Sequence, residues 1–241
     1  NNDAVPDPTW LASLVAAARS HPEAGMFASR MVFAHAPDTI NSAGIATDVL
    51  GIAWDRHSGR HSGDDQDAEV FGPSAGAALY RRELLEATGG FDPAYFAYLE
   101  DVDLAWRAQW LGWRGRYVAA ARVLHAHSAT GIEDSAFKTY QLGRNKLVTV
   151  LKNYPAAPLL RYLPLMLAYD LASLPVTIWR QRSLAAVRGR LVALASLGSI
   201  WRRRRAVMEA RRARWTDIRA RLEPVEPPWA IWRRHRKLRA I

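Results

Sequence analysis

The sequence changes character at Pro155, and this change constrains the fold more than any other feature. Residues 1–154 carry 14 Lys and Arg against 18 Asp and Glu, whereas residues 155–241 carry 19 against 5. The net charge of +10 therefore combines a mildly acidic body with a strongly basic tail. We interpret the two parts separately, with a domain boundary expected between residues 154 and 155.

The overall composition indicates a globular protein. Its 241 residues suffice for one domain and an appendage, and 49% of them are hydrophobic. The absence of cysteine excludes disulfides, zinc–thiolate sites and cysteine nucleophiles, and it agrees with a reducing compartment. The chain starts without Met and without a signal-like segment, so we expect that a preceding portion is missing.

Local patterns predict alternating helices and strands in the body. Thr9 is a candidate N-cap for a helix that runs to about Ser20, and "GMFASRMVF" reads as a strand. Gly89 and Gly90 are expected to end a helix that starts near Arg81. Further helices are predicted over residues 100–111 and 135–153, and a strand over 115–127. Residues 35–69 are rich in turn formers, and we expect the part over 55–69 to be mobile or disordered.

The tail combines an apolar stretch with a basic one. Residues 159–179 are largely apolar but are interrupted by Arg161, Asp170 and two prolines. Because a spanning helix tolerates central charge poorly, we expect a broken amphipathic arrangement on a surface rather than a membrane span. A basic helix with interleaved Trp is predicted over residues 200–222. Arginine and Trp suit an anionic membrane surface, and nucleic acid or packing on the body or on a second subunit stay open as alternatives.

Three carboxylates crowd the start of one predicted helix, at Glu100, Asp101 and Asp103. Acidic residues in a first turn face the positive end of the helix dipole, and Asp103 is spaced to pair with Arg107. These effects account for one or two of the acids. Like charges held close together also raise the proton affinity of at least one carboxylate, which can then act as a general base. A structural and a catalytic interpretation both stay open at this point.

Other candidates are weaker when each is taken alone. Asp3 in "NND" suits either a turn or a site for Mg²⁺ or Mn²⁺. His125 and His127 share one strand face and are either a half-buried polar pair or imidazole ligands. Gly76 permits either tight packing or close backbone approach to a ligand. Arg144 lies on a polar helix face or holds a diphosphate through its fork of donors.

Taken in order, these pieces resemble one protein family. The segments "NNDAVPDPTWL", "GAALYRRELLEATGGFDPAYFAYLEDVDLAWRAQWLGWRGRYV", "VLHAHSATG" and "GRNKLVTVLKNYP" are similar to family 2 glycosyltransferases, and most similar to the rhamnosyltransferase-like subgroup. The resemblance covers about residues 1–155, and its most specific part runs from Gly89 to Arg107. It implies an α/β, Rossmann-like GT-A core, truncated at its N-terminus and followed by the basic helical tail.

The resemblance also implies roles for individual residues. Asp101 matches the general base of the family's ED motif, with Glu100 beside it. Asp3 and His125 match the residues that hold a divalent cation, Mg²⁺ or Mn²⁺, while His127 lies at a variable position. Donor or acceptor contacts are implied for Gly76, Ala77, Asp103, Arg107, Arg144 and Asn145. Asn145 replaces the Trp of the QxxRW motif of processive relatives, which argues against a processive enzyme.

Function and partners follow as expectations from the same resemblance. The implied reaction transfers a sugar, with rhamnose as the subgroup's commonest label, from a nucleotide-sugar donor to a glycan or lipid-linked acceptor, with inversion. We expect a cytoplasmic enzyme, peripheral on the inner face of the cell membrane, that binds no nucleic acid. Without the family's N-terminal half, this chain alone is expected to bind nucleotide poorly and to be inactive. The rival hypothesis is a non-enzymatic basic protein that binds membrane or nucleic acid.

Overall fold

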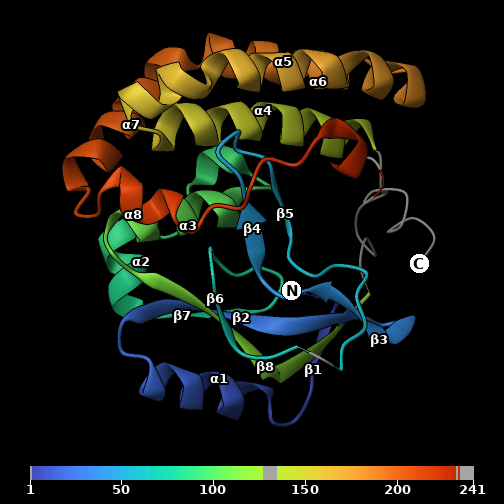
Figure 1. Ribbon diagram of the computed structural model, residues 1–241, viewed down its shortest axis with the longest axis vertical. Helices are drawn as coiled ribbons and strands as arrows, with labels where there is room; N and C mark the ends of the chain where they lie inside the picture. Colours follow the sequence, from blue (N-terminus) through green and yellow to red (C-terminus); the bar gives the residue numbers. More distant parts are fainter. Residues whose placement is uncertain (1, 64, 127–134, 232, 234–241) are drawn as a thin grey trace.

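A mixed sheet forms the centre of the molecule (Figure 1). The computed structural model describes residues 2–63, 65–126, 135–231 and 233. Within them, six strands form the main sheet and two more form a separate pair. The main sheet consists of β1 (Ala4–Pro6), β2 (Ala24–Phe33), β3 (Ala36–Ser42), β6 (Ala68–Val70), β7 (Ala78–Tyr80) and β8 (Arg114–His125), and the pair is β4 (Ile45–Thr47) with β5 (Ala53–Asp55).

The register of the sheet brings distant segments to one edge. Strands β2 and β8 run parallel, with Phe33 opposite His125, so their carboxyl ends meet at this edge. Strand β1 pairs antiparallel with the end of β8, and Ala4 lies opposite His125. Strand β7 runs antiparallel to β2, so the loop that precedes β7 lies toward the same edge. In open α/β sheets, ligands bind at the carboxyl ends of the parallel strands.

Helices cover both faces of the sheet, as Figure 1 shows. Helix α1 covers one face, where Leu14 packs with Phe27 and Val118. On the other side, α3 contributes Trp106 and Trp110 to the largest core cluster. The helices of the body are α1 (Trp10–Ser20), α2 (Arg82–Thr88), α3 (Glu100–Trp110) and α4 (Ala136–Asn153), with a short 3-10 helix η1 (Pro93–Tyr95). This arrangement confirms the predicted α/β class.

Most predicted boundaries in the body are confirmed. Helix α1 begins directly after Thr9, although the Thr9 side chain makes no capping hydrogen bond. Helix α2 ends at Gly89, which adopts a left-handed conformation with φ of +74°. Ser135 caps α4 by accepting a hydrogen bond from the backbone N–H of Lys138 at 3.1 Å. The strongest local signals, glycine stops and hydroxyl caps, therefore located helix ends correctly.

The prediction of a mobile or disordered segment over residues 55–69 is wrong for the part that the structure describes. Strand β6 starts within this segment, and the backbone N–H of Gly59 donates to the carbonyl of Ile40 at 2.9 Å. Arg30 donates to the carbonyl of Ser62 at 3.0 Å. Composition alone indicated disorder because the contacts that order this segment come from residues far away in the sequence.

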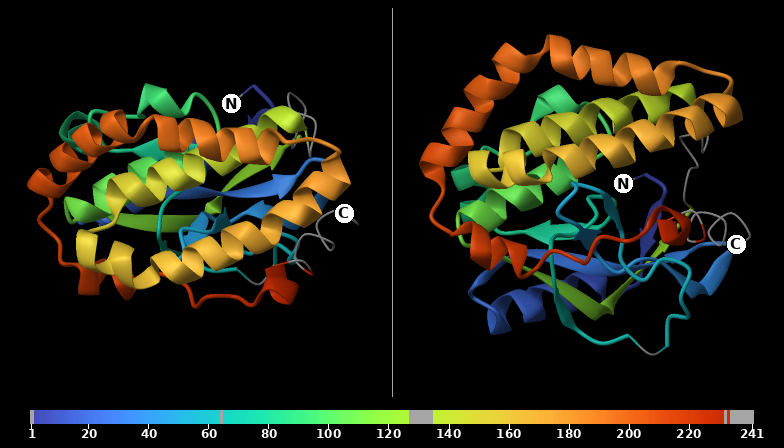
Figure 2. Two further views of the ribbon diagram at one scale, coloured as in Figure 1. Left: turned by 90° about the horizontal axis from the view of Figure 1, so that it is seen from above. Right: turned by 45° about the horizontal axis from the view of Figure 1, so that its top comes forward.

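The tail folds into helices that lie over α4 and α3, as both views in Figure 2 show. The apolar stretch forms one helix with Pro164 and Pro175 inside it, so the predicted break is wrong. The basic stretch forms two helices rather than the single one predicted. The tail helices are α5 (Ala156–Gln181), α6 (Ala185–Ala195), α7 (Leu197–Ala210) and α8 (Trp215–Arg219).

Specific contacts tie the tail to the body. The indole of Trp215 stacks on that of Trp106, with ring centroids 6.1 Å apart and planes 4° apart. Arg204 donates to the carbonyl of Leu151 at 2.8 Å, near the end of α4. The backbone N–H of Glu223 donates to the carbonyl of Thr47 at 2.9 Å. Among the described helices, α5 is the one with the length and composition to cross a membrane, and 11% of its most apolar window is buried.

Candidate active site

Asp101 lies in the first turn of α3, beside the loop that leads into β7. Its Oδ2 atom accepts a hydrogen bond from the backbone N–H of Ala75 at 3.0 Å, and its Oδ1 atom accepts one from the backbone N–H of Val102 at 2.8 Å. Glu100 and Asp103 share the same first turn. The helix start thus orients the Asp101 carboxylate through two backbone donors, which fix its direction without neutralising it.

The surroundings of Asp101 raise its affinity for a proton. Burial and the neighbouring charge of Glu100 raise the pKa of Asp101, the two backbone hydrogen bonds lower it, and the net result is a pKa of about 7. Burial also raises the pKa of Glu100. A carboxylate with a pKa near neutrality is suited to accept a proton from a substrate and release it again.

Two buried polar atoms nearby lack hydrogen-bond partners among the described residues. They are Oε2 of Glu100 and the hydroxyl oxygen of Tyr80. Burial raises the pKa of Tyr80 well above its usual range, and the charges of Asp101 and Glu100 raise it further. Buried polar groups are nearly always hydrogen-bonded in folded proteins, so unfilled groups beside a tuned carboxylate mark a place for polar ligand atoms.

Asp3 and His125 lie together at the carboxyl edge of the sheet. His125 Nε2 is 3.3 Å from Asp3 Oδ1, and both side chains are largely buried. On its other side, His125 Nδ1 lies 2.9 Å from Oδ1 of Asn41. An amide oxygen can only accept, so Nδ1 carries the hydrogen, and in neutral imidazole Nε2 then presents its lone pair toward Asp3. In the described part of the chain, no group of three His, Asp or Glu side chains is placed to hold a metal ion.

The sheet register relates Asp101 to this pair. Asp101 is bonded to Ala75, and the neighbouring Gly76 packs so closely on Met31 that a Cβ would lie 2.9 Å from the Met31 Cε atom. Met31 of β2 in turn lies opposite Val123 of β8, two residues before His125. The carboxylate and the Asp3–His125 pair therefore belong to the same edge of the sheet.

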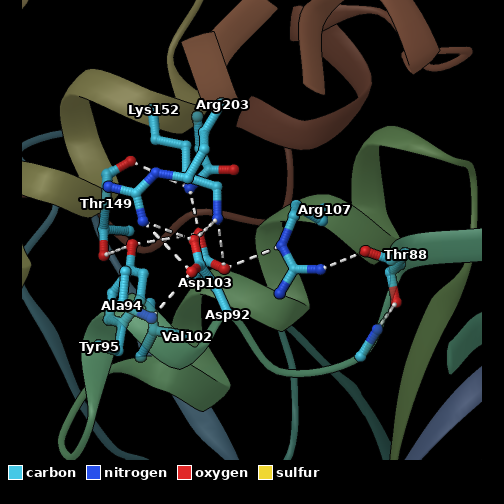
Figure 3. Close-up of polar contacts among 12 residues, drawn as sticks. Thr88, Asp92, Ala94, Tyr95, Val102, Asp103, Arg107, Thr149, Lys152 and Arg203 are labelled. Atoms are coloured by element: carbon cyan, nitrogen blue, oxygen red, sulfur yellow. Dashed lines mark hydrogen bonds and ion pairs between the residues drawn. The ribbon is translucent and has the colours of Figure 1, made fainter. Parts of the chain in front are cut away.

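Asp103 is the centre of a buried network of charges (Figure 3). Its carboxylate has no exposed surface and accepts from Arg107 Nε at 2.8 Å and from Lys152 Nζ at 2.9 Å. Lys152 also donates to Asp92 at 2.7 Å, and Arg203 of α7 pairs with Asp92 at 3.0 Å. We call these five residues the Asp103 network. A cavity of about 430 Å³ opens beside the network, between residues 87–93 and α7, and its lining includes neither Asp101 nor Asp3.

The loop before α3 has an unusual backbone that α4 holds in place. Phe96, Tyr98 and Leu99 all have positive φ values between 62° and 66°, a region that bulky residues rarely adopt. The buried Asn145 donates through Nδ2 to the carbonyls of Tyr95, Ala97 and Tyr98, at 3.1, 2.9 and 2.7 Å. Arg144 donates to the carbonyl of Ala94 at 2.8 Å. These contacts fix the backbone that leads directly into the Asp101 turn.

The predicted site residues thus separate into groups. Asp101 and Glu100 lie in the first turn of α3 beside the loop that contains Gly76 and Ala77, and Asp3 and His125 lie together at the same edge of the sheet. Asp103, Arg107, Arg144 and Asn145 contact other parts of the protein, so their proposed contacts with donor or acceptor stay predictions. Asn1 and His127 lie outside the described residues.

Sequence reasoning missed two participants, Tyr80 and Asn41. Nothing in the local pattern marks either residue. Tyr80 ends an ordinary short strand, and Asn41 is 84 positions from its partner His125. Only the pairing of distant strands reveals that they belong to the site.

Comparisons with known proteins identify the family and several relatives of this chain. A family model described as "Glycosyltransferase like family 2" matches residues 1–145, more than half of the chain. A segment of 57 residues is 49% identical to N-acetylglucosaminyl-diphospho-decaprenol L-rhamnosyltransferase of Mycobacterium tuberculosis (strain ATCC 25618 / H37Rv), and it covers 23% of this chain and 19% of that protein. A segment of 144 residues is 31% identical to the O-antigen biosynthesis protein RfbC of Myxococcus xanthus, and it covers 56% of this chain and 11% of RfbC.

The matched segments span less than a fifth of either relative. The family match nevertheless covers the whole candidate site, from Asp3 through Asp101 to Asn145. The mixed α/β sheet and the helical C-terminal region are consistent with a GT-A core and the tail predicted from the sequence. The chain therefore belongs to glycosyltransferase family 2.

Proposed function

We propose that the full-length protein is an inverting glycosyltransferase of cell-envelope polysaccharide synthesis. It moves a sugar from a nucleoside-diphosphate donor to a hydroxyl of a glycan or lipid-linked acceptor, at the cytoplasmic face of the membrane. Family membership supports the reaction class, and the names of the relatives support rhamnose as the sugar and a polyprenyl-linked acceptor as the substrate class.

The observation that carries this proposal is the Asp101 carboxylate. It is held by the backbone donors of Ala75 and Val102 at the start of α3, and its pKa is raised to about 7. A sugar hydroxyl is a poor nucleophile because its own pKa is high, and a positioned base typically accelerates its attack by about 10²–10⁴-fold. These features support Asp101 as the proposed base.

The proposed step is a single displacement. The acceptor oxygen forms a bond to the anomeric carbon while the bond from that carbon to the diphosphate oxygen breaks. The acceptor proton passes to the Asp101 carboxylate, and the nucleoside diphosphate leaves with the electron pair of the broken bond. Because attack and departure occur on opposite faces, the anomeric configuration inverts and no covalent sugar–enzyme bond is needed.

Asp3 and His125 fit a divalent cation. A carboxylate oxygen and an imidazole nitrogen 3.3 Å apart are two suitable ligands, and Asp3 Oδ1 is buried without a hydrogen-bond donor among the described residues. The contact from His125 to Asn41 is of the kind that orients a ligating histidine. When bound, Mg²⁺ or Mn²⁺ would supply positive charge against the diphosphate of the donor.

The unfilled polar atoms of Glu100 and Tyr80 define the proposed acceptor side. A carboxylate oxygen can accept from an acceptor hydroxyl, and a phenol can donate to one. The loop before β7 forms the other side of this place, because Ala75 donates to Asp101 and Gly76 packs closely on Met31.

The test is turnover by the full-length protein and its Asp101→Asn variant. We expect the variant to bind the donor normally and to lose at least about 100-fold in turnover, because it keeps the shape of the carboxylate without its basicity. Glu83→Gln, in the first turn of α2, is the matched control and should retain turnover. Near-normal turnover by Asp101→Asn would refute the assignment of the base. No turnover by the parent protein with any nucleotide-sugar would favour the non-enzymatic alternative.

A further inference from the structure

Helix α5 is apolar on the side that faces water as well as on the side that packs. Its inner side contributes the buried Leu159 and Met166 to the core. Six large apolar side chains along its length are exposed, namely Leu160, Leu165, Leu167, Leu171, Val176 and Trp179. A helix that is apolar all round is normally buried in protein or in lipid, so the outer side of α5 lacks the environment that its sequence fits.

The exposed charges of residues 156–202 have one sign. Across residues 156–202 the sequence contains a single acid, Asp170. Its carboxylate is turned inward, where it pairs with Lys146 at 3.2 Å and accepts from Arg190 Nη2 at 3.0 Å. The exposed charged residues in this range are all arginines, at positions 161, 180, 182, 188 and 202. We call the exposed apolar side chains of α5 together with these arginines the outer tail face.

We propose that the outer tail face docks flat on an anionic lipid bilayer. Exposed leucines can enter the boundary between headgroups and acyl chains, Trp179 suits the headgroup level, and arginines can meet lipid phosphates. Residues 156–202 expose no acid, and this favours a lipid partner because the rims of protein–protein interfaces normally match charges of both signs. Figure 2 shows, in the view from above, that α5 and α6 lie along the outside of the molecule.

The contacts of α5 argue for lying on the bilayer rather than crossing it. Asp170 is bound to partners on α4 and α6, and the hydroxyl of Tyr169 donates to the carbonyl of Glu226 at 3.1 Å. Insertion across the membrane would break these contacts and place the Asp170 carboxylate in hydrocarbon, which is costly. Docking on the surface keeps every one of them.

The test is co-sedimentation of the full-length protein with vesicles of phosphatidylcholine alone or mixed with phosphatidylglycerol. We expect sedimentation with the anionic vesicles and release by high salt. The triple variant Leu167→Gln/Leu171→Gln/Trp179→Gln should bind about 10–100-fold more weakly, since each substitution removes apolar surface from the lipid. Its matched control is Val5→Gln/Leu11→Gln, which changes similarly exposed apolar residues on β1 and α1 and should bind normally.

A second variant tests the charges independently. Arg161→Gln/Arg180→Gln/Arg182→Gln should weaken binding to anionic vesicles by about fivefold per arginine and remove the preference for phosphatidylglycerol. Arg19→Gln/Arg82→Gln, on α1 and α2, is its control. Circular dichroism checks that each variant is folded.

Several outcomes would overturn the proposal. The first is equal sedimentation with neutral and anionic vesicles. The second is wild-type binding by both triple variants. The third is retention of the protein in the bilayer after alkaline carbonate extraction, which indicates a membrane-spanning helix. Binding of RNA without binding of vesicles, or a dimer in solution that the leucine variant dissociates, would assign the face to another partner. The readout is binding, so failure here leaves the proposed transfer reaction untouched.

Discussion

At the scale of single residues, Asp101 shows how position alone changes the chemistry of a carboxylate. Asp103, two residues along the same helix, is more deeply buried, yet it is surrounded by cations. Asp101 has only backbone donors and an acidic neighbour, and its pKa rises to about 7. One helix turn therefore holds a carboxylate that is paired with cations and another whose affinity for a proton is raised.

The raised pKa of Asp101 predicts the pH dependence of activity. A general base must be deprotonated, so we expect kcat/KM of the full-length protein to rise with pH through a midpoint near 7. The rate profile of wild-type protein between pH 5 and 9 measures this midpoint. A midpoint near 4, the value of an ordinary aspartate, would contradict the prediction.

The raised pKa of Asp101 also affects stability, which should fall with rising pH whereas activity should rise. The folded pKa of Asp101 lies above its unfolded value of 3.8, so between these two values the folded protein binds more protons than the unfolded chain. We expect this residue's contribution to the free energy of unfolding to fall as pH rises from about 4 to 7. Urea unfolding at pH 5 and pH 8 measures the fall, and Asp101→Asn should reduce the difference between the two pH values. An unchanged difference in this variant would count against the raised pKa.

Asn41 offers a test of the proposed cation site that does not remove a ligand. Loss of a residue that orients a metal ligand typically weakens metal binding by about 10–100-fold, and we expect this range for Asn41→Ala. Titration with Mn²⁺, followed by the loss of the free-ion paramagnetic resonance signal, measures the affinity. Asn2→Ala, outside the contact between Asn41 and His125, is the control. Equal affinities in wild type and Asn41→Ala would argue against the site.

At the scale of elements, the Asp103 network joins α3 to α4 and α7. Lys152 contacts both carboxylates of the network and is almost fully buried. We expect Lys152→Met to lower the free energy of unfolding by about 3–5 kcal/mol, because it leaves buried charge without its partner. Arg205→Met breaks an exposed ion pair with Glu209 and should cost about 0–1 kcal/mol. Chemical denaturation of both variants measures the contrast, and similar losses would contradict it.

The elements also show how far the sequence could predict the structure. Helices with glycine stops, a serine cap or acids in the first turn were located correctly because those signals are local. The described part of residues 55–69 was misjudged because its order depends on distant partners such as Arg30 and Ile40. Helix α5 was predicted to break because Pro164 and Pro175 each remove a helix hydrogen bond. The helix nevertheless continues through both prolines, and it packs Leu159, Tyr162 and Met166 on the core. No local sequence pattern reports such packing.

The candidate site was predictable to a similar extent. Asp101, Asp3 and His125 were identifiable because the resemblance orders them along the chain. The direct contacts of Asn145 with the strained loop were not, since a buried asparagine and a ligand-binding one look alike in a sequence. The long-range pairing of β1 with β8, which delivers Asp3 to His125, is likewise invisible in local composition.

At the scale of the whole molecule, body and tail share one core despite their opposite charges. Trp215 of α8 packs against Trp106, Trp110 and Tyr154 of the body. Because Trp215 is partly buried against the core, we expect Trp215→Ala to lower the free energy of unfolding by about 2–3 kcal/mol, less than truncation of a fully buried tryptophan. Trp229→Ala, which truncates an exposed residue, is the control.

The same variants test cooperativity. If body and tail unfold together, tryptophan fluorescence and far-ultraviolet circular dichroism should report one coincident transition in wild type. Two separated transitions, or an unchanged stability in Trp215→Ala, would indicate that the tail only rests on the body.

The strained loop before α3 has a consequence that reaches beyond its own residues. Positive φ values in Phe96, Tyr98 and Leu99 each carry a cost of about 1–3 kcal/mol, and the contacts from Asn145 counter it. Contacts from α4, which lies under the tail, therefore hold the loop in this strained conformation. A shift of α4 would therefore also move the backbone that leads into the first turn of α3, where Asp101 lies.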